Sequence, residues 1–598
     1  MIGTFLLAVA VSVPSVGEVR LSSARSGSWK FEMTAEKTAD GVDAVKVAMR
    51  SETDAVPPKF SVNWFVSQRD THHFWTSEST HYGIPWGKPQ VSDLSSWMPL
   101  YAFLDANDRN RWTFACSESC RRVEFRSPIS ETQMGFNCGY TFFVSPEAPI
   151  REYEVKIRFD GRDLPYWETI GAASDWMCRA ANIEPMAAPE SAFDPLYSSW
   201  YVFHQDVTAA DIEAECALAA PLGMKTLITD DGWQIDLPPG NRAWGGYRLC
   251  GDWKAGMNFP DMAAHVKRVQ EKGFKYMLWY SVPFVGEKSA NFARFKGKFL
   301  PASCAGGHVL DPRFPEVREF TVKTYEDAVR NWNIDGLKLD FIGRFTLPDG
   351  VEDPAVKENY AGRDFKSVPA AVDRLMTDIL ARLKRLNPDV LVEFRQSYMG
   401  PAILKYGNMI RAADCPADPW SNRKRICDLR LTSGKTAVHS DMIVWNRNET
   451  PEGAALPILN ALFSTIQYSM VLAKINPAHK DVIRHWLRFS QDHRAALLKG
   501  GFRPHHAENG YTWIESWSDT ERILATYAGN QVLPVPADGK TVYAVNATLE
   551  DSLVLDLAEA PATAEAFDTF GRSVGSRSLA KGLNRVAVPP SGYLRLNQ

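Results

Sequence analysis

The stretch SVPAAVDRLMTDILARLKRLNPDVLVEF, residues 367–394, contains a helix followed by a strand and decides how the centre of the chain folds. Its apolar residues recur at the i, i+3, i+4, i+7 spacing of an amphipathic helix. They are Val372, Leu375, Met376, Ile379, Leu380, Leu383 and Leu386. Ser367 and Pro369 favour a helix start and Pro388 favours a stop. The apolar run at 390–394 then predicts a buried strand, so this stretch is one helix-and-strand unit.

The same alternation of short apolar runs and helical segments extends from about residue 185 to residue 500, which is typical of repeated βα units around a parallel sheet. The predicted strands are Ser198–His204, Thr226–Thr229, Tyr276–Tyr280, Gly336–Leu339, Val390–Phe394, Met409–Ala412, Ala437–His439 and Gln467–Leu472. Eight such runs predict a (β/α)8 TIM barrel. An open sheet is disfavoured because the glycine-rich phosphate turn of that class is missing from the sequence.

The two flanks of this central region have a different pattern. From about residue 18 to 165, period-two runs such as Phe60–Val66 and Arg151–Phe159 predict antiparallel strands. Alternation returns after about residue 502, as in Tyr511–Trp517. We therefore predict three domains. They are an N-terminal β-sandwich (18–180), a central catalytic barrel (181–501) and a small C-terminal antiparallel β domain, also a β-sandwich (502–598).

Charge and composition exclude several classes of partner. The 598 residues contain 67 Lys and Arg against 71 Asp and Glu, so the net charge of −4 does not suit tracking of nucleic acid or an anionic membrane surface. No run reaches the 18 apolar residues of a membrane span. The 19 Trp suit sugar binding, although most Trp residues in proteins pack in cores. A small or neutral partner therefore fits better.

The N-terminus carries an apolar run from Ile2 to about Val16, broken by Pro14 and followed by Gly17. A short apolar run that ends in small residues resembles a signal peptide over residues 1–17, although no Lys or Arg precedes Arg20. The alternative is a first β-strand of the mature fold. We expect an exported protein, periplasmic or extracellular, with a cytoplasmic location as the alternative.

The nine cysteines are odd in number and scattered, which does not suit a small domain held by disulfides. Cys116 and Cys120 form a CxxxC motif with Cys138 downstream and no adjacent His. A local disulfide or free thiols are favoured over zinc, because a structural zinc site needs four ligands at recurrent spacing. The sequence predicts neither a metal nor a cofactor.

Polar residues stand at the ends of five predicted barrel strands. These are Asp230 and Asp231, Lys338 and Asp340, Glu393 and Arg395, Arg411 and Asp414, and His439 and Asp441. Any one of these segments alone could be a turn or a helix cap. Several in register favour a functional site at the C-terminal face of the barrel, where the active sites of this fold lie.

These motifs, in this order, resemble those of the family 36 glycoside hydrolases, the α-galactosidases and their clan relatives. The resemblance rests on LITDDGWQ (227–234), GDWK (251–254) with NFP (258–260), GFKYMLW (273–279) and DGLKLDF (335–341). It spans roughly residues 195–445. It implies a β-sandwich before the catalytic barrel, a small antiparallel sheet after it, and a retaining mechanism with two catalytic aspartates.

The resemblance implies that Asp340, in the K-x-D motif, is the nucleophile. Lys338 lies two residues earlier on the same face of the strand, where its ammonium could keep that carboxylate ionised, or form a structural ion pair. The implied acid/base follows Arg411, and two candidates are present. Asp414 is favoured because it is nearest the strand end. Asp418 precedes Pro419 and could instead shape the loop.

The remaining implied roles concern sugar recognition. Asp230 and Asp231 match the acidic pair that accepts the axial 4-hydroxyl and the 6-hydroxyl. Trp233 and Trp279 are expected to wall the pocket, with core packing as the alternative for Trp279. The resemblance further assigns Arg395 and Arg411 to sugar hydroxyls or to tuning of the acid/base, and both could equally be scaffold.

The glycine- and cysteine-containing segment that many family members carry after strand five is replaced here by EFRQSYMGP (393–401), which leaves the 2-substituent of the sugar open. We therefore expect an exo-acting retaining α-galactosidase acting on oligosaccharides or glycoconjugates. The alternatives are an α-N-acetylgalactosaminidase, a transglycosylase of the raffinose-synthase kind, and a sugar-binding protein without catalysis.

Overall fold

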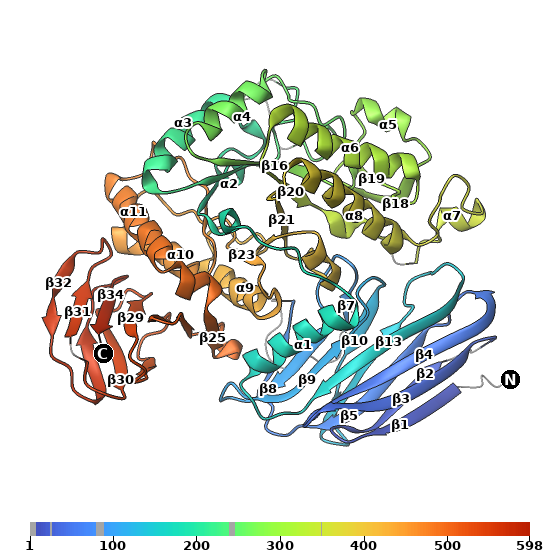
Figure 1. Cartoon of the computed structure of the whole chain (residues 1–598), viewed down its shortest axis with the longest axis horizontal. Helices are drawn as coiled ribbons and strands as arrows, with labels where there is room; N and C mark the ends of the chain where they lie inside the picture. The colour runs from blue at the N-terminus through green and yellow to red at the C-terminus, as the bar shows by residue number, and fades with distance from the viewer. Residues whose placement is uncertain are drawn as a thin grey trace.

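The computed structural model describes residues 7–23, 27–78, 89–237, 245–348, 350–561 and 563–597. Figure 1 shows three bodies in chain order: N-terminal sheets in blue, a helix-covered barrel in green to orange, and C-terminal sheets in red. The predicted fold class of a β-sandwich, a (β/α)8 barrel and a small C-terminal β domain is confirmed. The three domain boundaries stay predictions.

The N-terminal body consists of two antiparallel sheets. The first contains β1 (Leu7–Val13), β2 (Gly17–Ser23), β5 (Phe60–Ser67), β7 (Gln90–Ser92), β10 (Val123–Arg126), β11 (Ile129–Ser130) and β12 (Gly135–Phe142). The second contains β3 (Lys30–Ala39), β4 (Val42–Ala55), β6 (His73–Thr76), β8 (Leu100–Leu104), β9 (Asn110–Cys116) and β13 (Ile150–Asp160). Aromatic rings fill the space between the sheets: Trp64 of the first lies 5.0 Å from Phe114 and 4.9 Å from Phe159 of the second, between ring centroids. This shared core makes the two sheets one sandwich.

The N-terminal apolar run contributes a strand to this sandwich. β1 pairs antiparallel with β2 from Leu7 to Val13, and Val13 is buried. The start of the predicted signal segment, residues 1–6, lies outside the described residues. A paired strand is what the alternative interpretation expects for the rest of the run, and export stays a prediction.

The barrel has eight parallel strands. In sequence they are β14 (Leu196–Ser198), β15 (Thr226–Thr229), β16 (Lys275–Ser281), β20 (Gly336–Asp340), β21 (Leu391–Arg395), β22 (Met409–Arg411), β23 (Ala437–His439) and β24 (Gln467–Tyr468). β24 pairs with β14, and isolated parallel bridges from His439 and Ile443 to Thr465 and Tyr468 bring the two ends of the sheet together. The carboxyl ends of all eight strands therefore meet at one face.

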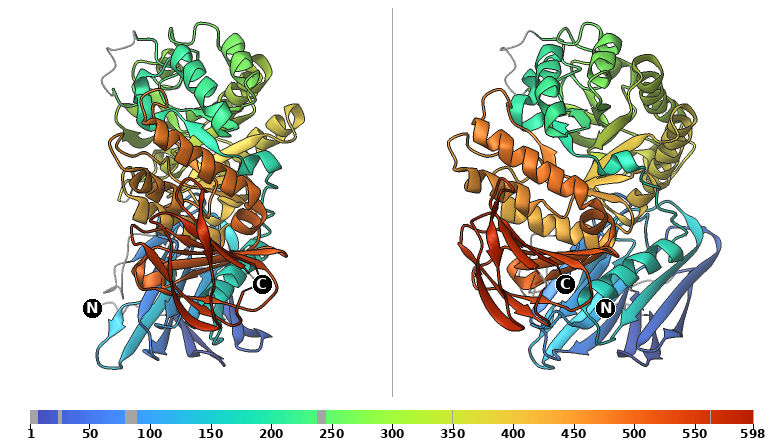
Figure 2. Two further views of the ribbon diagram at one scale, coloured as in Figure 1. Left: turned by 90° about the vertical axis from the view of Figure 1, so that its left-hand side faces the viewer. Right: turned by 60° about the vertical axis from the view of Figure 1, so that its left-hand side comes forward.

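Helices surround these strands (Figure 2). The longer ones are α3 (Ala209–Ala219), α4 (Met262–Gln270), α6 (Pro315–Trp332), α8 (Val368–Leu386), α9 (Pro419–Thr432), α10 (Pro451–Asn460) and α11 (Pro477–Asp492). Shorter helices are α2 (Trp200–Phe203), α5 (Ala290–Arg294) and α7 (Pro354–Lys357), and a small sheet of β17 (Phe284–Gly286), β18 (Phe299–Cys304) and β19 (Gly307–Leu310) follows β16. In α8 the predicted apolar stripe is buried from Val372 to Leu383, whereas Leu386 at the end of the helix is exposed. The Ser367 hydroxyl caps the helix at the Ala370 amide. This helix confirms the prediction from the opening stretch.

The predicted strand positions are largely confirmed, with two errors of extent. The prediction of a strand over Ser198–His204 is wrong beyond Ser198, because the chain turns at Ser199, where the backbone is helical, and continues as α2. The run Trp200–Phe203 is aromatic and β-branched, so its propensity favours a strand, and tertiary context overrides that propensity. The eighth strand is also shorter than predicted and ends at Tyr468.

The C-terminal body has two sheets. One contains β25 (Gly501–His505), β26 (Trp513–Trp517), β27 (Glu521–Thr526), β29 (Thr541–Asn546), β31 (Thr563–Phe567), β32 (Ser573–Arg577) and β34 (Tyr593–Asn597). The other contains β28 (Val532–Val535), β30 (Ser552–Leu557) and β33 (Gly582–Ala587). The pairing is mostly antiparallel as predicted, but β27 with β29 and β28 with β30 are parallel, because the chain alternates between the sheets over this stretch.

Several buried contacts join the three bodies. Helix α1 (Tyr166–Ala180) follows the sandwich, and its Tyr166 hydroxyl donates to the Pro504 carbonyl of the C-terminal body. The indole of Trp75 in the sandwich donates to Asp428 of the barrel at 2.9 Å. No helix in the described ranges is both long enough and apolar enough to span a bilayer. All nine cysteines, which lie within those ranges, are free thiols.

Candidate active site

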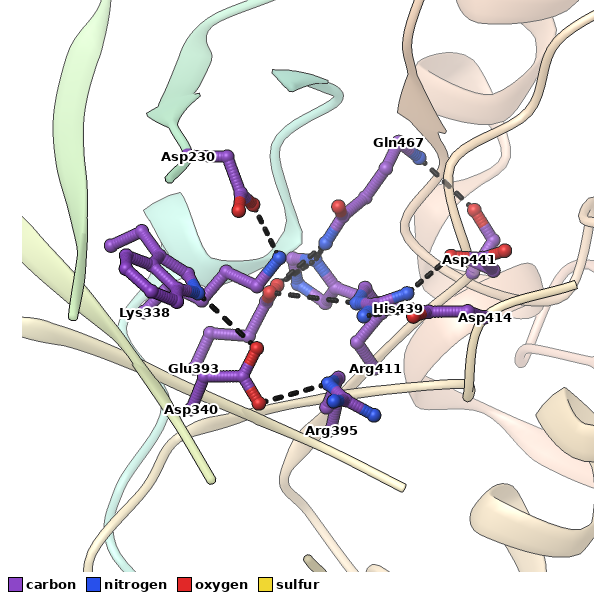
Figure 3. A network of polar contacts seen from close by, with 12 residues as sticks. Asp230, Lys338, Asp340, Glu393, Arg395, Arg411, Asp414, His439, Asp441 and Gln467 are labelled. Atoms are coloured by element: carbon purple, nitrogen blue, oxygen red, sulfur yellow. Dashed lines mark hydrogen bonds and ion pairs between the residues drawn. The ribbon is translucent and has the colours of Figure 1, made fainter. Parts of the chain in front are cut away.

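The strand register brings the predicted polar residues to one level of the barrel. Lys338 on β20 lies opposite Glu393 on β21, and Arg395 lies opposite Arg411 on β22, which in turn lies opposite His439 on β23. Figure 3 shows these side chains converging as one network of charged groups. The prediction of a polar cluster at the strand ends therefore agrees with the geometry.

Asp340 is the last residue of β20, and both of its carboxylate oxygens accept hydrogen bonds. Its Oδ1 accepts from Arg395 Nε at 3.0 Å and from the Phe341 amide at 2.8 Å, and its Oδ2 accepts from Trp279 Nε1 at 3.2 Å. The carboxylate is buried. Donors on two neighbouring strands fix its orientation, as a nucleophile in a site of this kind requires.

Lys338 makes a different contact from the expected one. Its ammonium lies 2.5 Å from Oδ2 of Asp230, and both side chains are almost fully buried. The nearest cation to the candidate nucleophile is therefore Arg395, and Lys338 instead balances the charge of Asp230 at the end of β15. The side-chain alternation placed Lys338 on the correct face, but its long side chain extends past the neighbouring strand β16 to the end of β15.

Asp231 is completely buried, and two glutamine amides hold it. Gln205 donates to Oδ2 and Gln234 donates to Oδ1, each at 2.6 Å. Burial raises the pKa of the Asp231 carboxyl to about 7, against the lowering effect of these hydrogen bonds. Each oxygen keeps a lone pair, so a carboxylate here can still accept from a hydroxyl of a ligand.

Arg411 is fully buried between several carboxylates. One end of its guanidinium binds Asp441, and Nη2 donates to Oδ1 of Asp414 at 2.8 Å. Although burial disfavours ionisation, the charge of Arg411 and, less strongly, of Arg395 lowers the pKa of the Asp414 carboxyl. About half of the Asp414 side chain remains exposed, so this carboxylate is accessible at the edge of the cluster.

Arg395 links the two candidate catalytic carboxylates electrostatically. Burial opposes its charge, but the Asp340 carboxylate and, more weakly, Asp414 raise the pKa of its guanidinium. The guanidinium carbon lies 4.8 Å from the Tyr398 ring centroid and 5.5 Å from that of Phe341. This cation therefore contacts the Asp340 carboxylate and lies beside two aromatic rings.

The second acid/base candidate has another role in the fold. Asp418 precedes α9, and its side chain accepts from the Ser421 amide at 3.0 Å as the N-cap of that helix. It is exposed, and Arg411 binds Asp414 rather than Asp418. The geometry therefore favours Asp414 over Asp418, in agreement with the prediction.

The two tryptophans predicted to wall the pocket differ. Trp279 donates to the candidate nucleophile, as described above. Trp233 has no exposed surface, and its ring packs against Trp253, Tyr280 and Trp332 in the hydrophobic core. Its indole donates to the Trp279 carbonyl at 2.8 Å. The prediction that Trp233 lines the pocket is not supported by this position, because the ring supports Trp279 from behind.

Several residues of the cluster were not predicted from the sequence. Gln205, Gln467 and Tyr201 bind Asp231, Glu393 and Asp441, respectively. They lie outside the motifs, and their spacing carries no signal. Glu393 stands at a predicted strand end, and the sequence motifs imply no role for it. Among the described residues, no group of three His, Cys, Asp or Glu side chains is arranged to hold a metal ion.

No protein-family model and no curated protein matches this sequence. Solved structures do match. The GH36 alpha-galactosidase AgaA from Geobacillus stearothermophilus is 13% identical, with a TM-score of 0.63 over 100% of this chain and 87% of that one. The alpha-galactosidase from Lactobacillus brevis is 14% identical, with a TM-score of 0.61 over 99% and 85% of the two chains. TtGalA from Thermus thermophilus is 17% identical, with a TM-score of 0.54 over 80% and 99%.

The first two comparisons extend over essentially the whole chain, including the sheets on both sides of the barrel. At such low identity they establish a shared fold. The fold expected from the family 36 resemblance is thus confirmed. The chemistry has to be argued from the side chains of the cluster.

Proposed function

We propose that this protein is an exo-acting retaining α-galactosidase. The observation that carries the proposal is the carboxylate of Asp340, held by Trp279 and Arg395 at the end of β20, with Asp414 accessible beyond the neighbouring strand. The fold of GH36 alpha-galactosidases supports it. Some of those structures, variants of AgaA, are complexes with stachyose and raffinose, which supports an oligosaccharide substrate here.

In the first step an oxygen of Asp340 attacks the anomeric carbon. The bond from that carbon to the leaving oxygen breaks, and Asp414 gives its proton to the leaving oxygen. In the second step Asp414, now a carboxylate, takes a proton from water while the water oxygen attacks the same carbon. The glycosyl ester bond then breaks and Asp340 is released as a carboxylate. Two inversions return the sugar with its original configuration.

The contacts of Asp414 suit the second step best. Its ion pair with Arg411 keeps the carboxylate ionised and ready to act as a base. For the first step it must carry a proton, so we expect cleavage of substrates with poor leaving groups to favour acidic pH.

Recognition of the sugar falls to the buried acidic pair. Asp230 is paired with Lys338, and Asp231 is held by two amides, so both carboxylates are oriented before substrate binds. Preoriented carboxylates can distinguish an axial hydroxyl from an equatorial one, because only one of these geometries brings the hydroxyl within hydrogen-bonding distance.

A second candidate function is α-N-acetylgalactosaminidase activity. The observation behind it is the segment after β21, where Arg395 lies between Phe341 and Tyr398 beside the candidate nucleophile. In this proposal Arg395 lies near the 2-substituent of the bound sugar. Its Nη2 makes only a long hydrogen bond of 3.4 Å to the Tyr398 hydroxyl, so this nitrogen could also donate to an acetamido oxygen.

A panel of aryl α-glycosides that share one leaving group and differ only in the sugar tests the proposal. We expect the α-galactoside to have the highest kcat/KM. If the enzyme cleaves the α-N-acetylgalactosaminide but not the α-galactoside, the proposed sugar specificity is wrong and the proposed retaining mechanism still stands. Binding of galactosides without turnover of any aryl α-glycoside would contradict the proposed activity. A product transferred to an added sugar rather than to water would identify a transglycosylase.

A further inference from the structure

Glu393 is a fully buried carboxylate that shares a neighbour, Arg411, with the candidate acid/base. It lies on β21 and has no exposed surface. Its Oε2 accepts from Gln467 Nε2 at 2.5 Å. Within the described part of the chain, no donor forms a hydrogen bond to its Oε1. A buried carboxylate with an unfilled oxygen is costly, so its presence calls for a reason beyond packing.

The guanidinium of Arg411 forms an ion pair with that oxygen. Arg411 Nε lies 3.9 Å from Oε1 of Glu393 and is likewise without a hydrogen-bond partner among the described residues. The other nitrogens of this guanidinium bind Asp441 and Asp414. One cation thus faces three carboxylates, one along each side, and only Asp414 extends to the surface of the cluster.

The other groups around Glu393 are either neutral or already paired. His439 Nδ1 lies 3.5 Å from Oε2, while its Nε2 lies 2.8 Å from the Ala192 carbonyl. A carbonyl only accepts, so Nε2 carries the hydrogen. Burial lowers the pKa of His439 to about 4, so this ring is neutral near pH 7. Lys338, level with Glu393 in the register, has its ion pair with Asp230.

We infer that Glu393 is a positioning residue that holds the Nε edge of Arg411 and, through Arg411, sets the orientation and the proton affinity of Asp414. The inference rests on the proposed function, in which Asp414 is the acid/base. When Glu393 is ionised, its negative charge partly neutralises the positive charge of Arg411. Less of that charge then acts on Asp414, and Asp414 binds its proton more firmly.

Burial raises the pKa of Glu393 to about 7, against the lowering effect of Lys338 and Arg411, so its charge changes close to neutral pH. Removal of this charge leaves Arg411 to act on Asp414 and Asp441 alone. The proton of Asp414 should then be lost at lower pH, which weakens general acid catalysis first for substrates with poor leaving groups.

The test compares Glu393→Gln with Glu215→Gln. Glu215 is a buried glutamate of the same barrel that accepts from the Leu472 amide at 2.8 Å and lies outside the cluster. We would measure kcat/KM on aryl α-galactosides with acidic and weakly acidic phenols across the pH range. At pH 7 and above, where Glu393 of the parent is ionised, we expect Glu393→Gln to lose about tenfold more activity with the weakly acidic phenol and to show an alkaline limb ~0.5 pH units lower. Below pH 7, where Glu393 of the parent is protonated, the two enzymes should converge. The control should show neither effect.

A double-mutant cycle tests whether Glu393 acts through Asp414. Glu393→Gln in an Asp414→Ala background should cause little further loss, because the group it acts on is gone. Full additivity, equal losses with both phenols, or an unmoved alkaline limb would each overturn the inference. If Glu393→Gln fails to fold, Glu393→Asp serves instead, because its shorter side chain keeps the negative charge but places it farther from Arg411. This variant should also lose more kcat/KM with the weakly acidic phenol than with the acidic one.

A crystal structure of either variant provides a readout that does not need activity. We expect the Arg411 guanidinium to rotate and its Nη2 contact with Asp414 to change, whereas an unchanged Arg411 and Asp414 would overturn the inference. Failure of the proposed function would instead show in the parent protein, as absence of α-galactoside turnover.

Discussion

Arg395 and Asp340 form an ion pair across two neighbouring barrel strands, with Nε 3.0 Å from Oδ1. The candidate nucleophile is thus oriented by a cation from β21, while Lys338, two residues before it in sequence, holds Asp230. Arg395 therefore orients the candidate nucleophile, whereas Lys338 pairs with one of the predicted sugar-binding aspartates. Substitution of these two cations should have different effects on kcat and KM.

Arg395→Met should lower kcat by about 10², because the nucleophile loses an orienting donor and a misplacement of about 1 Å at the reacting centre costs that much. The loss should be similar for good and poor leaving groups, since the nucleophile acts in both. Lys338→Met should mainly raise KM, because Asp230 loses its partner. Steady-state kinetics on aryl and natural galactosides measures both. If Lys338→Met lowers kcat with KM unchanged while Arg395→Met does the reverse, these assignments are exchanged.

Asp340→Gly should abolish turnover of natural substrates. External azide should restore cleavage of an activated α-galactoside, because it can occupy the position of the missing carboxylate and form a β-galactosyl azide. Product analysis by NMR identifies the azide adduct and its anomeric configuration. An α-galactosyl azide would place the attacking group on the other face of the sugar and argue against a nucleophile at position 340.

Asp414→Ala should lose about 10²–10⁴ in kcat/KM on a natural disaccharide, in the range of general acid contributions. It should lose far less in the first step on a nitrophenyl galactoside, where the leaving group needs no proton. The glycosyl-enzyme should then accumulate, because deglycosylation lacks its base, and a burst of nitrophenol should be visible in stopped flow.

The matched variant is Asp418→Ala, which removes the N-cap of α9. It should cost about 1 kcal/mol of stability. Any loss of activity should be uniform over leaving groups, without a burst. If Asp418→Ala instead shows the burst and the dependence on leaving group, and Asp414→Ala shows neither, then Asp418 is the acid/base.

Glu147 provides a prediction about stability against pH. Burial raises the pKa of its carboxyl from 4.5 to about 7, although Arg121 lies 3.7 Å away and opposes the shift. The folded protein therefore keeps a proton that the unfolded chain releases near pH 4.5. The unfolding free energy contributed at this site is complete below pH 4.5 and is lost as pH rises towards 7.

Glu147→Gln, which does not ionise, should therefore gain stability relative to the parent as pH rises from about 4.5 to 7. Denaturant unfolding at several pH values measures the difference, with the exposed Glu131→Gln as the control. A difference that is constant over this range, or that has the opposite sign, would show that Glu147 is ionised in the folded state.

Much of the barrel could be predicted because its strands are short, apolar and bounded by turn residues. The run at Thr226–Thr229 and the helix at 368–386 both follow from local periodicity. The first strand could not be delimited, because the aromatic run after Ser199 has strand propensity but folds as α2. Propensity describes the local chain, whereas the turn at Ser199 is set by its contact with the Ile228 carbonyl on β15.

The candidate site was predictable as a set of residue types at strand ends, and not as a set of contacts. Alternation along β20 placed Lys338 and Asp340 on one face, but whether the ammonium extends to Asp230 or to Asp340 depends on how the sheet places β15, two strands away. The motif likewise drew attention to Trp233, whose burial depends on rings from distant segments. Such side-chain partners are non-local, and one sequence carries no signal for them.

Proton NMR during the first minutes of hydrolysis of 4-nitrophenyl α-galactoside shows whether a double displacement takes place at the anomeric carbon. We expect α-galactose to appear first and the β anomer to increase later by mutarotation. β-Galactose as the first product, or no galactose at all with intact folded protein, would contradict it.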